Sequence, residues 1–394
     1  MRVARRVVPA VAAAIALLAG ATPARAAVPD YWNASELGSN FSEFFAVNDN
    51  ADAAGLSAAG GTGDARPIIR YGGQPAQVVA LPPAFDSGVF FGINASGVAS
   101  GQAGDPNGNS YALSYDHGTI HTFGPGLAVR GINNAGVMAG GSVSPLAPHL
   151  PILLAPNGAQ TVLSTSVFDG GSALDISDTN IVVGQVTQGG NPLPAQWSAT
   201  GLLSLLPLPS GYASGGAYWV NSAGDAVGLL NPTNGGGIPD GVFWSHDGTV
   251  QLLPTIGTNH SIPQGINDDG DVVFLSGDGS STAFGSYVWS AGHVYNVNSR
   301  VSSPNPVEMF AISNNATLAG ITHTTLGATV LTPQTGAFAH ITLKPLKLKL
   351  PSPIPPLDLT IPLNGLPLHG KLEVIAKKGL IQLPTLGALP IGLP

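Results

Sequence analysis

The sequence predicts an all-β protein, a seven-bladed β-propeller, on two observations. A segment of the form Gly-Ile-Asn-x-x-Gly recurs in seven copies about 44 residues apart. Only 9% of the residues are charged while glycine numbers 53, a composition that suits β-sheet with many tight turns and disfavours helices. The chain has no cysteine, so a regular hydrogen-bonded framework, rather than disulfides, must hold the fold.

The chain begins with the pattern of a secretory signal peptide over residues 1–26. A start with three arginines precedes an apolar run over 7–18 and the small-x-small sequence Ala24-Arg25-Ala26. The apolar run is too short to span a bilayer. We therefore expect cleavage after about Ala26 and a mature protein that is secreted, periplasmic or on the cell surface. Residues 27–43, which include Trp32, are a candidate for the strand that closes the ring.

The repeats occupy residues 44–343, and each copy carries a polar residue followed seven positions later by a glycine. The polar residues are Asn48, Asn94, Asn133, Ser177, Asn221, Asn267 and Ser313. The glycines are Gly55, Gly101, Gly140, Gly184, Gly228 and Gly320, with Phe274 in the remaining copy. We interpret the polar residue as part of a hairpin turn, the Ile or Val before it as packing between repeats, and the glycine as a point of close approach by a neighbouring backbone or ring.

A second hairpin follows each copy after about twenty residues, as in PAQWSATGLLSLL, where glycine-containing turns separate apolar runs. Two hairpins give four short strands per repeat, which matches a propeller blade, and seven blades fall within the usual number for a closed ring. An open β-solenoid is the alternative architecture. Aromatic residues recur at one place in the second hairpin, and we expect them to pack between blades; they are Trp197, Trp244 and Trp289, with Tyr71 and Tyr115 in two other units.

The sixth copy resembles the bacterial extracellular HAF repeat. The resemblance rests on Leu253-Pro-Thr-Ile-Gly257, Ser261, Gly265-Ile-Asn267 and Val272-Val273, and its weaker copies extend over about residues 44–343. It implies export and propeller-like repeats, and it implies no established activity.

Charge divides the protein into two parts. Between residues 27 and 343 four arginines and no lysine stand against 20 acidic residues, so this body carries a net charge of −16. A body this acidic is not expected to bind nucleic acid or anionic lipid. The tail, residues 344–394, carries +4 and holds ten prolines and fourteen leucines, too broken for a transmembrane helix. We expect it to lie along the ring, with attachment to a partner or to the envelope as the alternative.

No motif in the sequence assigns a catalytic, cofactor-binding or metal-ligating residue. It contains no Gly-x-Ser-x-Gly elbow and no cysteine nucleophile. Asp116, His117 and His121 flank one predicted hairpin turn, so we interpret them as turn or surface residues, and His246 lies in the equivalent turn of another unit. The acidic copies at 48–52 and 267–271 loosely match calcium loops, and we interpret them as turns first.

The sequence thus favours a monomeric, non-catalytic propeller that acts as an interaction, glycan-binding or cell-envelope scaffold. The alternative is a secreted polysaccharide hydrolase or lyase, an analogy from the fold alone. That activity would need a pair of carboxylates or a charged cluster at the ring's face. The body's arginines offer a discriminator, because an anionic-polymer lyase becomes less plausible if they are scattered; they are Arg66, Arg70, Arg130 and Arg300.

Overall fold

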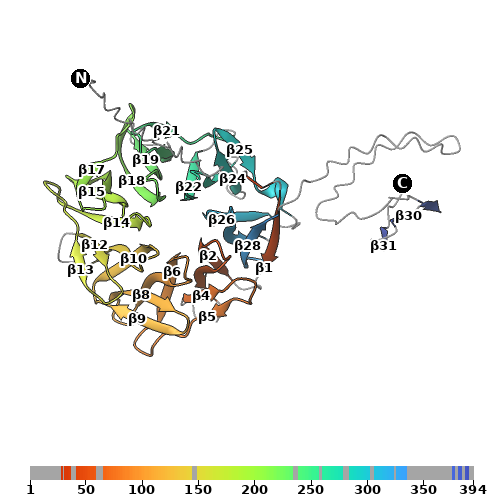
Figure 1. The fold of residues 1–394 in the computed structure, drawn as a ribbon, viewed down its shortest axis with the longest axis horizontal. Coiled ribbons are helices and arrows are strands. Elements are labelled where there is room, and N and C mark those ends of the chain that lie inside the picture. Colours follow the sequence, from red (N-terminus) through yellow and green to blue (C-terminus); the bar gives the residue numbers. More distant parts are fainter. Residues whose placement is uncertain are drawn as a thin grey trace, which may run out of the picture.

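The computed structural model shows a ring of seven antiparallel four-stranded sheets, which confirms the predicted β-propeller (Figure 1). The residues that it describes are 28–29, 31–36, 41–58, 65–143, 149–233, 238–256, 260–277, 284–301, 306–323 and 325–334, with strands within 375–389. The predicted signal peptide and most of the tail lie outside the described residues. The described tail strands are β29 (Ile375–Lys377), β30 (Leu380–Leu383) and β31 (Gly387–Leu389), which form a sheet of their own.

The first four blades follow one another along the chain, and each begins with the strand nearest the ring axis. Blade 1 consists of β2 (Ser42–Val47), β3 (Ala53–Ser57), β4 (Arg66–Arg70) and β5 (Gln77–Val78). Blade 2 consists of β6 (Ser87–Ile93), β7 (Ala99–Gly104), β8 (Ser110–Asp116) and β9 (Thr119–Phe123). Blade 3 consists of β10 (Leu127–Ile132), β11 (Met138–Ser142), β12 (Pro151–Leu154) and β13 (Gln160–Val162). Blade 4 consists of β14 (Gly170–Ile176), β15 (Val182–Gln188), β16 (Asn191–Trp197) and β17 (Leu203–Leu205).

The last three blades complete the ring in the same order. Blade 5 consists of β18 (Tyr212–Val220), β19 (Ala226–Pro232), β20 (Asp240–Trp244) and β21 (Val250–Leu252). Blade 6 consists of β22 (Ser261–Ile266), β23 (Val272–Gly277), β24 (Phe284–Ser290) and β25 (His293–Asn296), followed by the 3₁₀ turn η1 (Asn298–Arg300). Blade 7 consists of β26 (Val307–Ile312), β27 (Leu318–Thr322), β28 (Ala328–Pro333) and, from the start of the chain, β1 (Trp32–Glu36).

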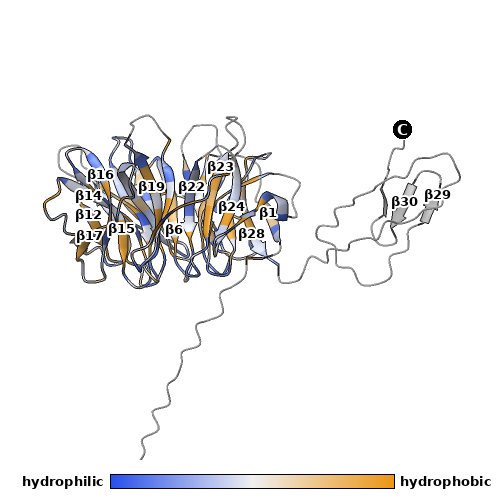
Figure 2. Ribbon diagram, turned by 90° about the horizontal axis from the view of Figure 1, so that it is seen from above, coloured by the Kyte–Doolittle hydropathy of each residue, from blue (hydrophilic) through white to orange (hydrophobic). Residues whose placement is uncertain are grey.

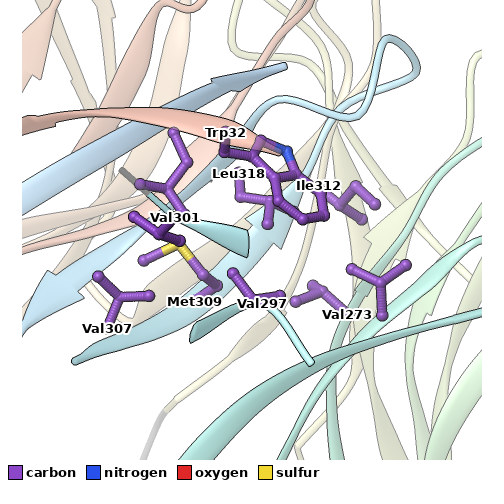
Figure 3. Packing of buried hydrophobic residues seen from close by; sticks show 10 residues of the cluster. Trp32, Val273, Val297, Val301, Val307, Met309, Ile312 and Leu318 are labelled. Atoms are coloured by element: carbon purple, nitrogen blue, oxygen red, sulfur yellow. The ribbon is translucent and has the colours of Figure 1, made fainter. Parts of the chain in front are cut away.

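Strand β1 closes the ring, because it supplies the outer strand of the last blade. It pairs antiparallel with β28 from Trp32 opposite Pro333 to Glu36 opposite Thr329. The Trp32 side chain is fully buried against Leu318 and Met309 of the same blade (Figure 3). Its Nε1 donates to the carbonyl of Ala316 at 2.7 Å. The two ends of the propeller are thus held in one sheet.

The core of the protein lies between the blades, so that no blade buries its faces alone. Seven apolar clusters fill these spaces, and in one of them Phe44 and Val47 of blade 1 pack on Ala319 and Val330 of blade 7. The Ile or Val that precedes each polar repeat residue lies in a different cluster in each blade. In a side view of the propeller, the strands carry many hydrophobic residues between the upper and lower faces of the ring (Figure 2).

The recurring aromatic residues of the second hairpin are packing residues. Trp197, Trp244 and Trp289 are buried, and the first two donate from Nε1 to the carbonyls of Ser164 and Pro207. They pair with the first residue of the second strand, as Tyr115 does with Ala99.

In blade 1 the position of these aromatic residues belongs to Arg70, paired with Ala53, and Tyr71 lies one residue beyond it. The expectation for Tyr71 was therefore off by one residue, because β4 ends at Arg70.

A β-bulge recurs in the inner strand of every blade. The register between first and second strands shifts at the same point in all seven sheets. Directly before the bulge, the inner strand lies very close to the second strand. A Cβ on the facing residue of the second strand would lie well inside 3.0 Å of a backbone carbonyl oxygen of the inner strand. The residues at this point are Gly55, Gly101, Gly140, Gly184, Gly228 and Gly320. Phe274 takes the place in blade 6, where it pairs with Pro263.

The polar repeat residues form a ring of hydrogen bonds, here called the turn ring, which crosses every blade junction. The Oδ1 of Asn48 accepts the N–H groups of Asn50 and Asp52 and so holds its own turn, while Nδ2 donates to the carbonyl of Asn94 in the next blade. The other junctions are bridged from Asn94 to Asn133, Asn133 to Asn180, Thr179 to Ser222, Asn221 to Asn267, Asn267 to Ser313 and Asn315 to Asp49.

Serine at two of these positions changes which residue makes the bridge. The hydroxyls of Ser177 and Ser313 each accept an N–H within their own turn, but a hydroxyl has no amide group for the next blade. Thr179 and Asn315, two residues further on, supply the donors in these blades.

Candidate functional site

A cavity of about 530 Å³ lies on the ring axis and is lined mainly by the seven inner strands. Its volume falls within the range of about 300–1,000 Å³ that is usual for small-molecule sites. Because the wall is built from strands rather than from long loops, the side chains on it are held by the hydrogen-bonded sheets. We treat this central channel as the candidate functional site.

The β-bulges decide which side chains reach the channel. A residue at a bulge is left out of the ladder, and its side chain is aimed differently from those of its neighbours. In each blade this residue stands three positions before the polar residue of the turn ring. The seven bulge residues, all on the channel wall, are Phe45, Phe91, Arg130, Leu174, Tyr218, Gln264 and Phe310.

Three of these bulge residues form an apolar arc: Phe310, Phe45 and Phe91, on the consecutive blades 7, 1 and 2. The ring centroid of Phe45 is 5.8 Å from that of Phe310 and 6.0 Å from that of Phe91, distances typical of favourable aromatic pairs. All three side chains are half-buried. They present a continuous aromatic surface to one side of the channel.

The rest of the wall mixes polar and apolar side chains, and the residue after the bulge differs most clearly between blades. At this position five blades carry glycine or alanine, whereas the adjacent blades 4 and 5 carry Asp175 and Trp219. Arg130, Tyr218 and Gln264 lie on the same side, and with Asp175 and Trp219 they form what is here called the polar arc of blades 3 to 6, which also includes the apolar bulge residue Leu174. Asp175 and Trp219 thus set the channel wall of blades 4 and 5 apart from that of the other five blades.

The Asp175 carboxyl group links two blades by hydrogen bonds and has a raised pKa. Its Oδ1 accepts the N–H of Ile176 at 2.9 Å, and its Oδ2 accepts the N–H of Val220 in the next blade at 3.0 Å. Burial raises the pKa of the Asp175 carboxyl to about 7, with a smaller contribution from nearby Asp178, while the two N–H bonds act in the opposite direction. A Cβ at position 131 would overlap Oδ1 of Asp175, which accounts for Gly131 in blade 3.

Arg130 places a positive charge on the wall beside the apolar arc. Its guanidinium carbon lies 5.1 Å from the ring centroid of Phe91, a cation–π contact. The other body arginines lie elsewhere: Arg66 and Arg70 on β4, and Arg300 in η1, where it stacks on Tyr295. The arginines are therefore scattered, and Arg130 alone among them lines the channel.

Apart from Arg130, the polar residues, glycines and histidines singled out from the sequence are not the residues that set the character of the channel. The polar residues of the turn ring are buried and occupied with hydrogen bonds, and the repeat glycines face the inner strand. The bulge residues and the residues that follow them stand three and two positions before each polar residue. A column of the aligned repeats that mixes Phe, Arg, Leu, Tyr and Gln was the available signal, and it was missed because the well-matched columns report packing.

Two of the histidines near turns, His117 and His246, have local partners. His117 Nδ1 lies 2.8 Å from Asp116 Oδ1, and the His117 ring stacks on Tyr71. His121 is exposed on β9. His246 Nδ1 lies 2.6 Å from Asp225 Oδ1, and this hydrogen bond raises the pKa of His246.

The loosely calcium-like segments form turns of the same kind. In the segment 48–52 the Asp52 carboxylate accepts from Asn48 Nδ2 and from the N–H of Gly72, and Asn48 Oδ1 caps the turn. In the segment 267–271 Asn267 Oδ1 accepts the N–H of Asp271. Within the part of the chain that the structure describes, no group of three or more His, Asp or Glu is arranged to hold a metal ion, and no helix is long and apolar enough to cross a membrane.

Comparison with known proteins supports the fold and nothing finer. No protein-family model and no curated protein matches the sequence. A catalytically inactive variant of virginiamycin B lyase from Staphylococcus aureus is similar in structure, with a TM-score of 0.51 and 13% identity over 76% of this chain and 99% of that one. A chain from an analysis of two prolyl endopeptidases gives a TM-score of 0.52 and 13% identity over 78% of this chain and 48% of that one.

Proposed function

We propose that this protein is an exported, non-catalytic β-propeller that binds a glycan in its central channel. The observation that carries the proposal is the division of the channel wall into an apolar and a polar arc. A sugar ring has the matching character, with C–H groups on its faces and hydroxyls around its edge. Aromatic side chains pack on such faces, and a few well-placed polar groups fix the orientation of a ligand.

Export is part of the proposal and rests on the signal-peptide pattern of residues 1–26 and on the resemblance to extracellular HAF repeats. A protein outside the cell meets the glycans of the envelope. Envelope attachment through the tail, residues 344–394, stays a prediction, because most of that segment lies outside the described residues.

The enzymatic alternative finds less support in the channel. Glycoside hydrolysis uses two carboxyl groups, one on each side of the scissile bond. Among the described residues that line the channel, Asp175 is the one with a carboxyl group. The scattered arginines also offer no cluster for an anionic polymer.

The proposal is tested by binding of the mature full chain to a glycan array. Phe45→Ala removes the middle of the apolar arc and is expected to weaken binding about tenfold, which corresponds to about 1.4 kcal/mol. Leu202→Ala is the matched control, because this exposed residue lies directly before the outer strand of blade 4.

The control should bind like the unmodified protein. Absence of glycan binding, or an equal loss in both variants, would contradict a channel site. Turnover of a polysaccharide that disappears in Asp175→Asn would show that the protein is an enzyme.

A further inference from the structure

Arg130 is the single cation on the channel wall among the described residues, and its guanidinium has no polar partner there. It makes no ion pair and donates no hydrogen bond to any described residue, while it stacks on Phe91. The other stacked arginine behaves differently, since Arg300 donates from Nη1 to the carbonyl of Pro29. The five N–H groups of Arg130 are thus available to a ligand in the cavity.

The nearest channel acid does not satisfy Arg130. Asp175 lies against Gly131, the residue after Arg130, across the junction of blades 3 and 4. Its two oxygens, however, accept the N–H groups of Ile176 and Val220. The guanidinium carbon lies over the Phe91 ring, and the planar fork of N–H donors of an arginine matches a carboxylate in two parallel hydrogen bonds. The positive charge without a polar partner and the planar fork of donors together point to a planar anion beside the apolar arc.

We propose that the channel selects an acidic sugar, whose carboxylate pairs with Arg130 while a face of its ring packs on the apolar arc. This inference rests on the proposed function, the binding of a glycan in the channel. A single carboxylate group is compatible with the net charge of −16 of the body, because one guanidinium on the channel wall acts at short range, whereas a polyanion would meet the acidic surface as a whole.

The test uses matched pairs of oligosaccharides, in which a carboxylate replaces the hydroxymethyl group at C6. Trimers of glucose or galactose in which one terminal residue is glucuronic or galacturonic acid are compared with the fully neutral trimers by titration calorimetry of the mature full chain. At least one acidic trimer is expected to bind ten times more tightly than its neutral partner. Arg130→Gln should abolish that preference, so that the acidic and the neutral trimer bind to this variant with equal affinity.

Arg300→Gln is the matched control, since it removes an arginine that is also stacked on an aromatic ring but lies outside the channel. It should keep the preference for the acidic trimer. If neutral and acidic trimers bind equally and Arg130→Gln changes neither, the inference is wrong while the glycan site stands. If no trimer binds, the inference is wrong and the proposed function loses its support as well.

Discussion

Gly140 offers the sharpest test of the blade geometry. A Cβ at this position would overlap the carbonyl oxygen of Ala128 on the inner strand of blade 3, and its neighbours include the Cα of Val129. Both obstacles are backbone, so no side chain can rotate away. Gly140→Ala therefore has to push β10 away from β11 by roughly 1 Å at the bulge.

The cost follows from what this movement disturbs. Forcing an extra carbon into a packed site costs about 1–3 kcal/mol, and the strand pairing at the bulge loses one or two hydrogen bonds at about 1 kcal/mol each. We expect a loss of about 3 kcal/mol in the free energy of unfolding. At about 2–4 °C per kcal/mol, Tm should fall by about 6–12 °C.

The next residue in the same strand provides the control. A Cβ on Gly141 would meet its nearest atoms, the carbonyl oxygen of Leu150 and Oγ of Ser172, at 3.4 Å, an ordinary contact. Gly141→Ala should therefore change stability by less than about 0.5 kcal/mol. Urea unfolding followed by tryptophan fluorescence compares the two variants. Equal stability of the two would refute the steric argument.

Three further outcomes are expected. The pKa of Asp175 is about 7 in the folded protein, against 3.8 ordinarily, so between these pH values the folded state binds more protons than the unfolded state. The free energy of unfolding should therefore fall as pH rises through this range, by at most about 4 kcal/mol. Asp175→Asn should flatten this dependence in urea unfolding at pH 4–7.5. Trp289→Phe should lower the free energy of unfolding by about 1 kcal/mol less than Trp244→Phe does, and urea unfolding compares the two variants. The reason is that the buried Nε1 of Trp289 has no hydrogen-bond partner among the described residues, whereas that of Trp244 has one. Asn267→Ala should lower stability by about 1–3 kcal/mol, and Asn267→Ser, which keeps the turn, should fall between it and the unmodified protein in the same assay.

The turn ring shows how far a repeat pattern predicts contacts. Asparagine in the third place of a copy predicts a turn, and the structure adds that its amide reaches the next blade. The pattern could not predict that Thr179 and Asn315 replace this amide in the two serine copies. Which side chain reaches the next blade depends on the distance between the two blades, and the sequence of a single repeat does not contain this distance.

The channel was hidden from the sequence for a related reason. Phe310 and Phe45 belong to opposite ends of the repeat array, yet their rings lie 5.8 Å apart because β1 closes the ring. Asp175 likewise depends on Val220 of another blade for a hydrogen bond. Neither arrangement follows from any local property of the chain.

The sequence by itself determined the class of fold, the number of blades and the place of each hairpin. The alternation of apolar and polar residues, the glycine-containing turns and the fixed repeat period can be read from short stretches of sequence, because neighbouring residues set the local backbone preferences. The sequence also named residues 27–43 as a candidate for the closing strand, but only the tertiary structure decided that β1 pairs with β28, which seven side chains face the axis and which of them meet. A closed ring brings residues from every blade to one axis, and their proximity is set by closure and by the bulges rather than by distance along the chain.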